Sequence, residues 1–504
     1  MSEILLEIVS GEIPAGMQKK IAQNLANIFE AEIAKYVTQK GESNVFWSAR
    51  RIGFCYEGFS LATAPSAEEV RGPKTSAPDV ALEGFLKKYS LAKSDLYSQD
   101  HYYFAKIIHK SVSPQELLES ILKKILSSIT WPKSMKWNGD ETWVRPIYSI
   151  LAQFNGNILK FQYGNIQSSN TTLGHRIYSN HPISIDSFHS YKALLEQNFV
   201  ILSEEDRKSS ITSQASKILS LKGLRVVKDQ SLLDELAGLS EYPTVILSAI
   251  PKKFMSLPRE ILTLTLKTHQ RYLMVEDLEG NLAPYYCIVS NINPDDKSDI
   301  ISGNDSVLTA RLEDAKFFFD NDLKSGIKQN IEKLKNLTYH NSIGSYYIKQ
   351  QSVEKRALQL ARIFNLNEYD VSRAVWLAKA DLVSHTVREM PELQGIIGYY
   401  LTRNIESEEI ALAVRDHYKP KGPNDSIPSN KLAACVALAD KLDTIEQMFD
   451  QGIKPTGSKD PYALRRAALG IIRIAKEFDF DMEALLSLIT NKDGKTFIQD
   501  RLKD

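Results

Sequence analysis

The sequence predicts an α+β protein in which a mixed region of strands and helices precedes an all-helical domain. Up to about residue 300, short strand-like apolar runs alternate with helical segments, whereas beyond Val307 apolar residues recur with the helical period. The chain has 504 residues, which corresponds to about three domains of roughly 150 residues each. We expect an N-terminal α+β region at residues 1–215, a second α+β subdomain at 216–325 and a helical domain at 326–504.

The mixed region begins with an apolar run, Ile4 to Val9, that is typical of a strand, and continues with helical periodicity from Met17 to Val37. The Pro, Gly and Ser content of residues 65–73 predicts a loop, after which a helix is expected from Leu82 to Tyr89. Further strands are expected at Tyr102–Ile108, Ile147–Phe154, Val245–Leu247 and Ile261–Thr265.

The second half of the chain contains few prolines and few strand-like runs. Helices are predicted at Leu308–Asp320, Ser352–Phe364, Val371–Val387 and Leu432–Met448. A non-periodic insertion, Gly452 to Pro461, precedes a further helix that begins near Ala463. Because loops inside a helical domain often carry function, this insertion is a candidate functional segment.

Composition and charge exclude several classes of protein. The 62 Lys and Arg residues balance 62 Asp and Glu residues, so nucleic acid would have to bind at local basic patches. No apolar run reaches the roughly 18 residues of a membrane span, and Glu3 and Glu7 do not fit a signal peptide, so we expect a cytoplasmic protein. Three widely spaced cysteines, Cys55, Cys287 and Cys435, predict buried thiols.

The common motifs of stand-alone catalysts are absent. The tripeptide Gly494-Lys495-Thr496 lacks the first glycine of a phosphate-binding loop, because Ile489 occupies that position. Neither Gly-x-Ser-x-Gly nor His-Glu-x-x-His occurs, which argues against a serine hydrolase and a zinc protease.

Four residues of the helical domain form a candidate polar cluster. Asp381 and His385 are four residues apart, which would place them on one helix face, and His417 and Asp440 follow on later helices. The pattern resembles the HD phosphohydrolases, which bind a divalent metal through a histidine, a His-Asp doublet and a later aspartate. Asp381 would be the aspartate of the doublet and Asp440 the later aspartate.

Two departures from this pattern predict a degenerate, HD-like domain that holds no metal. Ala380 occupies the position of the histidine in the doublet, and no histidine lies between His340 and His385 to supply the first ligand. Loss of two imidazoles should remove most of the metal affinity. A metal-dependent HD-type phosphohydrolase is the alternative function, and a helical scaffold with locally paired polar residues is the structural alternative.

Basic residues are interleaved with aromatic ones at residues 131–146, and basic clusters recur at 267–272 and 459–466. Cations pair with phosphates and exposed rings stack on unpaired bases, a combination that suits RNA. In the alternative interpretation, tryptophan fills a core while lysine faces water. The candidates for RNA contact are Lys133, Lys136, Arg145, Lys267, Arg271, Lys459, Arg465 and Arg466.

Segments along nearly the whole chain, in this order, resemble the β subunit of the heterotetrameric bacterial glycyl-tRNA synthetase. The strongest are Met390–Gly395, Leu438–Thr444 and Pro455–Arg466. The others are Leu5–Ile8, Gly11–Ala15, Arg71–Pro73, Trp131–Trp137, Val144–Pro146, Gly174–Arg176, His269–Tyr272, Gly303–Asn304, Val307–Phe319 and Lys379–Leu382. Their collinear order makes the resemblance specific.

The resemblance implies a ligase that attaches glycine to tRNA(Gly) as an α2β2 complex using ATP and Mg²⁺. The adenylation site would belong to the α subunit, and this chain would bind tRNA, carry no catalytic residue and bind no cofactor, DNA or membrane. The family pattern continues into an anticodon-binding domain after the helical one. Because the sequence ends at Asp504, we expect that domain to be lacking and assign no anticodon contact to this chain.

Overall fold

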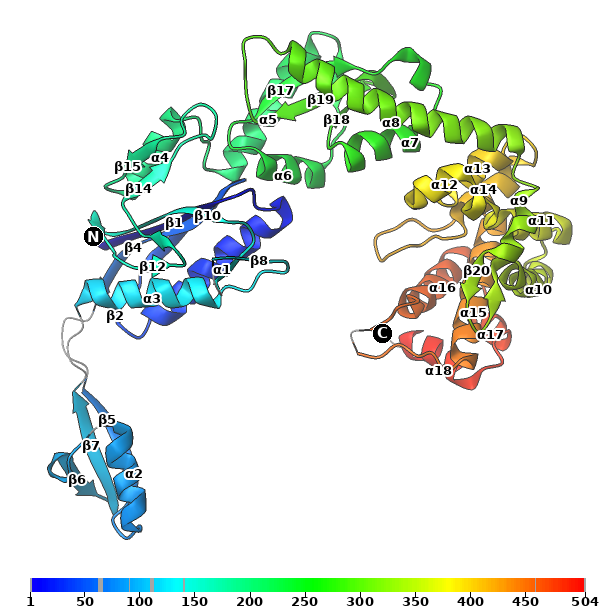
Figure 1. The fold of residues 1–504 in the computed structure, drawn as a ribbon. Coiled ribbons are helices and arrows are strands. Elements are labelled where there is room, and N and C mark those ends of the chain that lie inside the picture. The colour runs from blue at the N-terminus through cyan, green and yellow to red at the C-terminus, as the bar shows by residue number, and fades with distance from the viewer. Residues whose placement is uncertain are drawn as a thin grey trace. The chain divides into compact units, whose positions relative to one another are not determined.

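The computed structural model describes residues 2–61, 67–89, 91–108, 113–138, 141–457 and 459–502. The chain forms two compact units, and Figure 1 labels most of their elements. Unit 1 comprises residues 1–248 and 271–301, and unit 2 comprises residues 249–270 and 302–504. Unit 1 mixes strands and helices and unit 2 is mainly helical, which confirms the predicted fold class. The predicted three-domain division stays a prediction.

Unit 1 contains several sheets and six helices among its described residues. Its strands are β1 (Ser2–Ser10), β2 (Val37–Gln39), β3 (Glu42–Trp47), β4 (Arg51–Leu61), β5 (Ala67–Lys74), β6 (Leu96–Gln99), β7 (Tyr102–Ile108), β8 (Met135–Asn138), β9 (Glu141–Trp143), β10 (Ile147–Phe154), β11 (Asn157–Ile158), β12 (Gln162–Tyr163), β13 (Ile166–Gln167), β14 (Thr171–Leu173), β15 (Pro182–Ser184), β16 (Leu224–Val226), β17 (Thr244–Ala249), β18 (Leu273–Asp277) and β19 (Leu282–Ser290). Its helices are α1 (Ala15–Ile33), α2 (Asp79–Tyr89), α3 (Pro114–Ser128), α4 (Phe188–Gln197), α5 (Glu204–Ser220) and α6 (Gln230–Leu239).

The largest sheet of unit 1 has the strand order β11-β10-β1-β4-β2, with β3 also paired to β4. Both of its faces are covered, because Leu6 and Ile8 of β1 pack in one core with α1 and α3, while Leu5 packs on the other face with Tyr191 of α4. A strand that is buried on both faces reads as a continuous apolar run, and this is why the run from Ile4 to Val9 predicts β1 correctly.

Two further sheets of unit 1 have more than two strands each, and the pairs β8-β9, β12-β13 and β14-β15 form small two-stranded sheets. The sheet β16-β18-β19-β17 packs its apolar side chains against α5 and α6. The sheet β5-β7-β6 lies beside α2. The loop predicted at 65–73 is wrong from residue 67 onward, because Val70 pairs with Ala105 in β5, and the Gly72-Pro73 dipeptide falls where the register shifts. Residues 65 and 66 lie outside the described residues.

Most other predicted elements of unit 1 are confirmed. The predicted strands that correspond to β7, β10 and β17 and the predicted helix that corresponds to α2 are present. Helix α1 ends at Ile33 rather than at Val37, which instead begins the edge strand β2.

Unit 2 is built from helices and one short hairpin among its described residues. Its elements are α7 (Arg259–Thr263), a π-helical turn (Leu264–His269), α8 (Ser298–Ser325), whose first residues belong to unit 1, α9 (Asn330–Lys333), β20 (Thr338–His340), β21 (Gly344–Ser345), α10 (Tyr346–Phe364), α11 (Glu368–Ala378), a 3-10 turn (Ala380–Val383), α12 (His385–Glu389), a 3-10 turn (Pro391–Leu393), α13 (Ile396–Thr402), α14 (Glu408–Asp416), α15 (Lys431–Asp450), α16 (Leu464–Phe478), α17 (Met482–Ser487) and α18 (Lys492–Gln499). Helix α15 is the central one, since it packs against α10, α14 and α16 and buries residues on all its sides.

Two sequence predictions for unit 2 are wrong. The strand expected at Ile261–Thr265 is helical, because Pro258 precedes a helix start and a short buried apolar run fits either element. The helix expected at Val371–Val387 is interrupted after Ala378. A 3-10 turn follows, and the Ser384 side chain then caps α12 by accepting a hydrogen bond from the N–H of Val387.

The three cysteines are free thiols buried in the two units, as predicted. Within the described residues, no helix combines the length and the apolar character that a membrane crossing requires.

Candidate functional site

A cavity of about 360 Å³ lies at the surface of unit 2, beside α15 and the start of α16, and we call it the α15 pocket. It is lined by Glu392, Gln394, Tyr418, Pro420, Lys421, Asp440, Lys441, Thr444, Tyr462, Ala463, Arg466 and Ala467. Each of the three strongest segments of the family resemblance, at residues 390–395, 438–444 and 455–466, contributes to this lining. The fold therefore brings these distant parts of the sequence to one place.

The carboxylate of Asp440, on α15, forms part of the inner wall of the α15 pocket. Lys379 Nζ lies 3.2 Å from its Oδ2, and Lys349 Nζ lies 3.4 Å from its Oδ1. Burial opposes ionisation, but the charges of Lys379 and Lys349 outweigh this effect and hold the pKa of Asp440 well below its usual range. Lys349 also donates hydrogen bonds to Asp443 and Thr444, 2.8 Å away in each case. The two lysines thus neutralise the carboxylate at the base of the pocket.

Lys441, the next residue on α15, fixes the loop that follows α14. Its Nζ donates to the carbonyl oxygens of Lys419 at 2.8 Å and His417 at 3.2 Å. An ammonium group has three donors, so one remains for another acceptor. Burial lowers the pKa of Lys441 to about 7. The side chain therefore supplies both a structural tie and a cation that loses its charge easily.

Two residues of the candidate polar cluster, Asp381 and His385, do not share a helix face. Asp381 lies in the 3-10 turn after α11, where its Oδ2 accepts hydrogen bonds from the N–H groups of Gly395 at 2.6 Å and Gly398 at 3.0 Å. Burial raises the pKa of Asp381 to about 6. His385 is exposed, and its ring stacks on Phe318 with the centroids 6.4 Å apart. The prediction of a common face is wrong because the chain turns between the two residues.

His417 and Asp440 are the other two residues of the candidate polar cluster. His417 is fully buried with its Nδ1 2.7 Å from the carbonyl oxygen of Val414, and burial, with the nearby charge of Lys379, lowers its pKa well below the usual value. The ammonium groups of Lys379 and Lys349 already sit beside the two oxygens of Asp440. A divalent cation would have to displace them against charge repulsion. The residues present therefore do not fit the metal site of a phosphohydrolase.

The predicted RNA contacts at residues 131–146 divide into buried rings and exposed cations. Trp131 and Trp143 are at most 6% exposed and pack edge to face, 5.0 Å apart. These two rings cannot stack on a base, so the interpretation as core residues is correct for them. Lys133, Lys136 and Arg145 are exposed at and beside the hairpin of β8 and β9, where their charges can meet phosphate.

The candidates near residue 270 fall into different units. Lys267 lies in the π-helical turn of unit 2 and is partly buried. Arg271 lies in unit 1, where its side chain is paired with Glu235. An existing carboxylate partner weakens the attraction of Arg271 for phosphate.

The last group of candidates surrounds the start of α16. The Asp460 carboxylate accepts hydrogen bonds from the N–H groups of Leu464 at 2.8 Å and Arg465 at 2.9 Å, which fixes the first turn. Lys459 and Arg466 are exposed and Arg465 is partly buried. Arg466 lines the α15 pocket and Arg465 does not.

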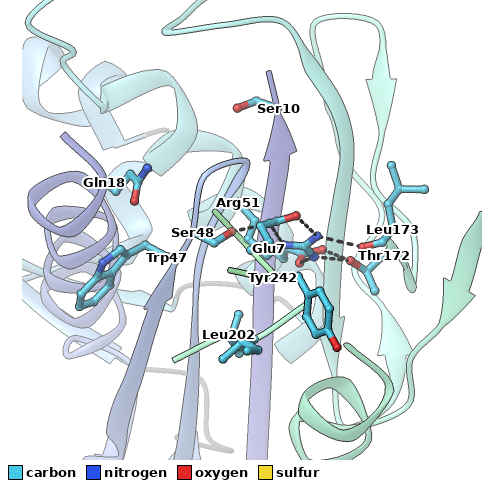
Figure 2. A network of polar contacts seen from close by, with 12 residues as sticks. Glu7, Ser10, Gln18, Trp47, Ser48, Arg51, Thr172, Leu173, Leu202 and Tyr242 are labelled. Atoms are coloured by element: carbon cyan, nitrogen blue, oxygen red, sulfur yellow. Dashed lines mark hydrogen bonds and ion pairs between the residues drawn. The ribbon is translucent and has the colours of Figure 1, made fainter. Parts of the chain in front are cut away.

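Unit 1 contains a buried polar network of a different kind, drawn in Figure 2. Arg51 of β4 donates to Glu7 of β1 at 2.9 Å and to Glu241 at 2.7 Å. Its Nη2 donates to the carbonyl oxygen of Leu173 at 3.0 Å, and Thr172 donates to Glu7. All three charged side chains are at most 1% exposed. The network joins strands β1, β4 and β14 to the segment at residue 241.

The comparison with known proteins agrees with the family resemblance found in the sequence. A sequence model of the family described as glycyl-tRNA synthetase beta subunit matches residues 4–504. The chain belongs to this family.

Three relatives of this beta-subunit family are named glycine–tRNA ligase beta subunit. The one from Phenylobacterium zucineum (strain HLK1) is 41% identical over 485 residues, which cover 95% of this chain and 72% of the relative. The one from Rickettsia bellii (strain OSU 85-389) is 38% identical over 512 residues, or 100% of this chain and 76% of the relative. The one from Rickettsia conorii (strain ATCC VR-613 / Malish 7) is 39% identical over 484 residues, or 95% and 72%.

Membership of the beta-subunit family confirms the predicted class, a subunit of an aminoacyl-tRNA ligase. The phosphohydrolase alternative gains no support from the comparisons or from the charges around Asp440.

Three lysines around Asp440, which are Lys349, Lys379 and Lys441, were not among the predicted site residues. Lys379 and Lys441 could have been found, because each lies within two residues of an acidic residue of the candidate polar cluster, Asp381 or Asp440. Lys349 has no such signal, since it reaches Asp440 only through the packing of α10 against α15. A lysine beside each acidic residue is the feature of this sequence that argues most directly against a metal ion.

Proposed function

We propose that this chain is the tRNA-binding subunit of a glycine–tRNA ligase and acts with an α subunit that carries the adenylation site. The match of the family model along residues 4–504 carries the proposal. The absence of nucleotide-binding and hydrolase motifs from the sequence supports the same division of labour. We further propose an α2β2 assembly in the cytoplasm that uses ATP and Mg²⁺, with no cofactor held by this chain.

The distribution of exposed cations supports contact with RNA. Lys133, Lys459 and Arg466 are exposed and form no ion pair with any described residue. Cations of this kind bind phosphate by releasing counterions, which makes the affinity depend on salt. The contribution of the chain would be to hold the tRNA so that its acceptor end reaches the active site of the partner, which turns an encounter into an oriented reaction.

Reconstitution of the ligase tests this proposal. Glycylation of tRNA(Gly) by the α subunit should require this chain, and this chain alone should form no glycyl-adenylate in a pyrophosphate-exchange assay. Adenylate formation by this chain alone, or full glycylation by the α subunit without it, would contradict the proposal.

A further inference from the structure

We propose that the α15 pocket binds one nucleotide of RNA, with its phosphate on Arg466, Lys421 and Lys441 and its base against the ring of Tyr462. This inference rests on the proposed function, because it names the part of the RNA that one surface of unit 2 would take. It follows from the charge, the size and the walls of the pocket.

The charge of the pocket favours an anion. Arg466 and Lys421 are exposed, and neither forms an ion pair with a residue that the structure describes. Two carboxylates line the pocket, but Asp440 is already neutralised by two lysines, and Glu392 is exposed at the rim. Lys441 has a donor left after its two bonds to backbone carbonyls. The pocket side chains whose charge is not neutralised by an ion pair are therefore mostly cationic.

The size of the pocket favours a nucleotide over a bare phosphate. A volume of about 360 Å³ falls in the range of roughly 300–1,000 Å³ that small-molecule sites occupy. A phosphate group would fill only a small part of this space. A sugar and a base attached to the phosphate would use the remainder.

The aromatic walls of the pocket differ in what they can still bind. Lys379 Nζ lies 3.8 Å from the centroid of the Tyr418 ring, and the His417 ring lies 3.9 Å from it. Tyr418 is therefore already covered by its neighbours. Tyr462 is 38% exposed and touches His340 only edge-on, with the centroids 5.6 Å apart. Its ring can thus accept a base by stacking, as aromatic side chains do with unpaired nucleotides.

The rim of the pocket carries groups that can contact the edge of a base. Glu392 and Gln394, which belong to the segment after α12, place a carboxylate and an amide there. A carboxylate accepts hydrogen bonds from an exocyclic amino group, and an amide can both donate and accept. The elements around the pocket are also fixed, because Lys441 holds the loop after α14 and Asp460 holds the start of α16. The site therefore exists before a ligand arrives.

The first experiment measures the binding of adenosine monophosphate to the full chain by isothermal titration calorimetry. We expect weak but saturable binding, a loss of at least tenfold in affinity for Arg466→Ala with Lys421→Ala, and no change for Lys476→Ala. Lys476 is the matched control, because it is an exposed cation on the last turn of the same helix, α16. Absence of adenosine monophosphate binding to the wild-type chain would overturn the inference.

The second experiment separates the phosphate contacts from the stacking contact. Tyr462→Leu should lower the affinity for adenosine monophosphate at least threefold and leave the lower affinity for inorganic phosphate unchanged. Circular dichroism of each variant checks that the fold is kept. Equal losses for both probes would contradict the role of Tyr462.

The third experiment distinguishes RNA from free nucleotide as the source of the ligand. A tRNA(Gly) transcript should displace adenosine monophosphate from the pocket. If the chain binds both at once, the nucleotide is a free small molecule and the RNA assignment is wrong. If the pocket binds no nucleotide but the proposed function is correct, glycylation still requires this chain. If the proposed function is wrong, glycylation does not require this chain, so the two results can be told apart.

Discussion

Arg51 in unit 1 and Asp440 in unit 2 are both charges held between two partners of opposite sign, but they differ in access to solvent. Arg51 and its two carboxylates are at most 1% exposed, whereas Asp440 keeps 15% of its side-chain surface and lines a cavity. Glu7 also accepts a hydrogen bond from Tyr191, which completes the closed network. The cluster around Asp440 in unit 2 is not closed in this way, because the Nε2 atom of His417, which interacts with the charge of Asp440, has no hydrogen-bond partner among the described residues.

The difference separates a structural site from a site that can still bind. A buried pair that is fully satisfied fixes strands in place and leaves nothing for a ligand. A cluster with excess cations at the edge of a cavity costs stability and retains attraction for an anion. Substitutions in the first cluster should therefore lower the stability most, and substitutions at the rim of the second should change binding most.

The largest expected effect is on the stability of unit 1. Arg51→Met removes the buried guanidinium that lies between the carboxylates of Glu7 and Glu241, so the free energy of unfolding should fall by about 3–5 kcal/mol. Four of the five tryptophans lie in unit 1, so denaturation followed by tryptophan fluorescence reports on this unit. Arg225→Ala, which breaks the more exposed pair with Glu276, is the control and should cost about 1 kcal/mol or less. Equal losses of stability for the two variants would show that the buried network around Arg51 contributes no more than an exposed ion pair.

A smaller loss of stability is expected when the cluster of Asp440 with Lys379 and Lys349 in unit 2 is disrupted. Asp440→Asn removes the carboxylate partner of Lys379, but Lys349 keeps its bond to Asp443. We expect a loss of about 2–3 kcal/mol, less than for Arg51, because a partly exposed charge regains some hydration. Fluorescence of Trp376, the tryptophan of α11, follows the unfolding of unit 2. A loss of stability larger than that of Arg51→Met would show that the cluster around Asp440 contributes more to stability than the network around Arg51.

The end of α14 in unit 2 carries a closed ion pair between Asp416 and Arg415, and its pH dependence is a third test. Burial opposes ionisation of Asp416, but hydrogen bonds from Arg415, Ser429 and Lys419 outweigh it and lower the pKa to about 2. A lowered carboxyl pKa gives stability that is present above the unfolded value and is lost as the pH falls through about 2.

Asp416→Asn should therefore destabilise unit 2 by about 2 kcal/mol at pH 7, and the difference from wild type should shrink to about half at pH 3. Urea denaturation at a series of pH values measures this difference. A difference that does not change with pH would show that the effect of the substitution is steric and not electrostatic.

The smallest expected effect on stability comes with a change in RNA binding. Arg465→Glu together with Arg466→Glu alters a partly buried and an exposed side chain, so the free energy of unfolding should change by less than about 0.5 kcal/mol. The affinity for tRNA should fall, and the slope of its logarithm against the logarithm of salt concentration should decrease by about two. An unchanged salt slope would show that neither arginine contacts the phosphates of the RNA.

Local patterns predicted much of the fold. The strands β1, β7, β10 and β17 and the helices α2 and α15 follow from their apolar runs and periodicity. The misplaced elements share a physical cause, which is that a neighbour decides the outcome. Residues 67–73 form a strand because β7 supplies hydrogen-bond partners, and the chain after Ala378 turns because Asp381 binds two distant backbone N–H groups.

The site could be predicted only in part for the same reason. His417, Asp440 and Arg466 were identified from motifs, and the structure places Asp440 and Arg466 in one pocket lining. The charge that defines the pocket depends on Lys349, which lies 91 residues before Asp440 in the sequence. A contact across that separation depends on helix packing, and no local pattern reveals it.

The division of the chain into units also bears on how the protein is made. Residues 249–270 belong to unit 2 but are followed by the last strands of unit 1. Glu260 in this segment accepts a hydrogen bond from the hydroxyl of Tyr400, and Lys253 pairs with Glu313. During synthesis, which proceeds from the N-terminus, the segment emerges from the ribosome well before those partners. A C-terminal fragment that begins at residue 302 would lack it altogether, so an isolated helical unit should be expressed with residues 249–270 supplied.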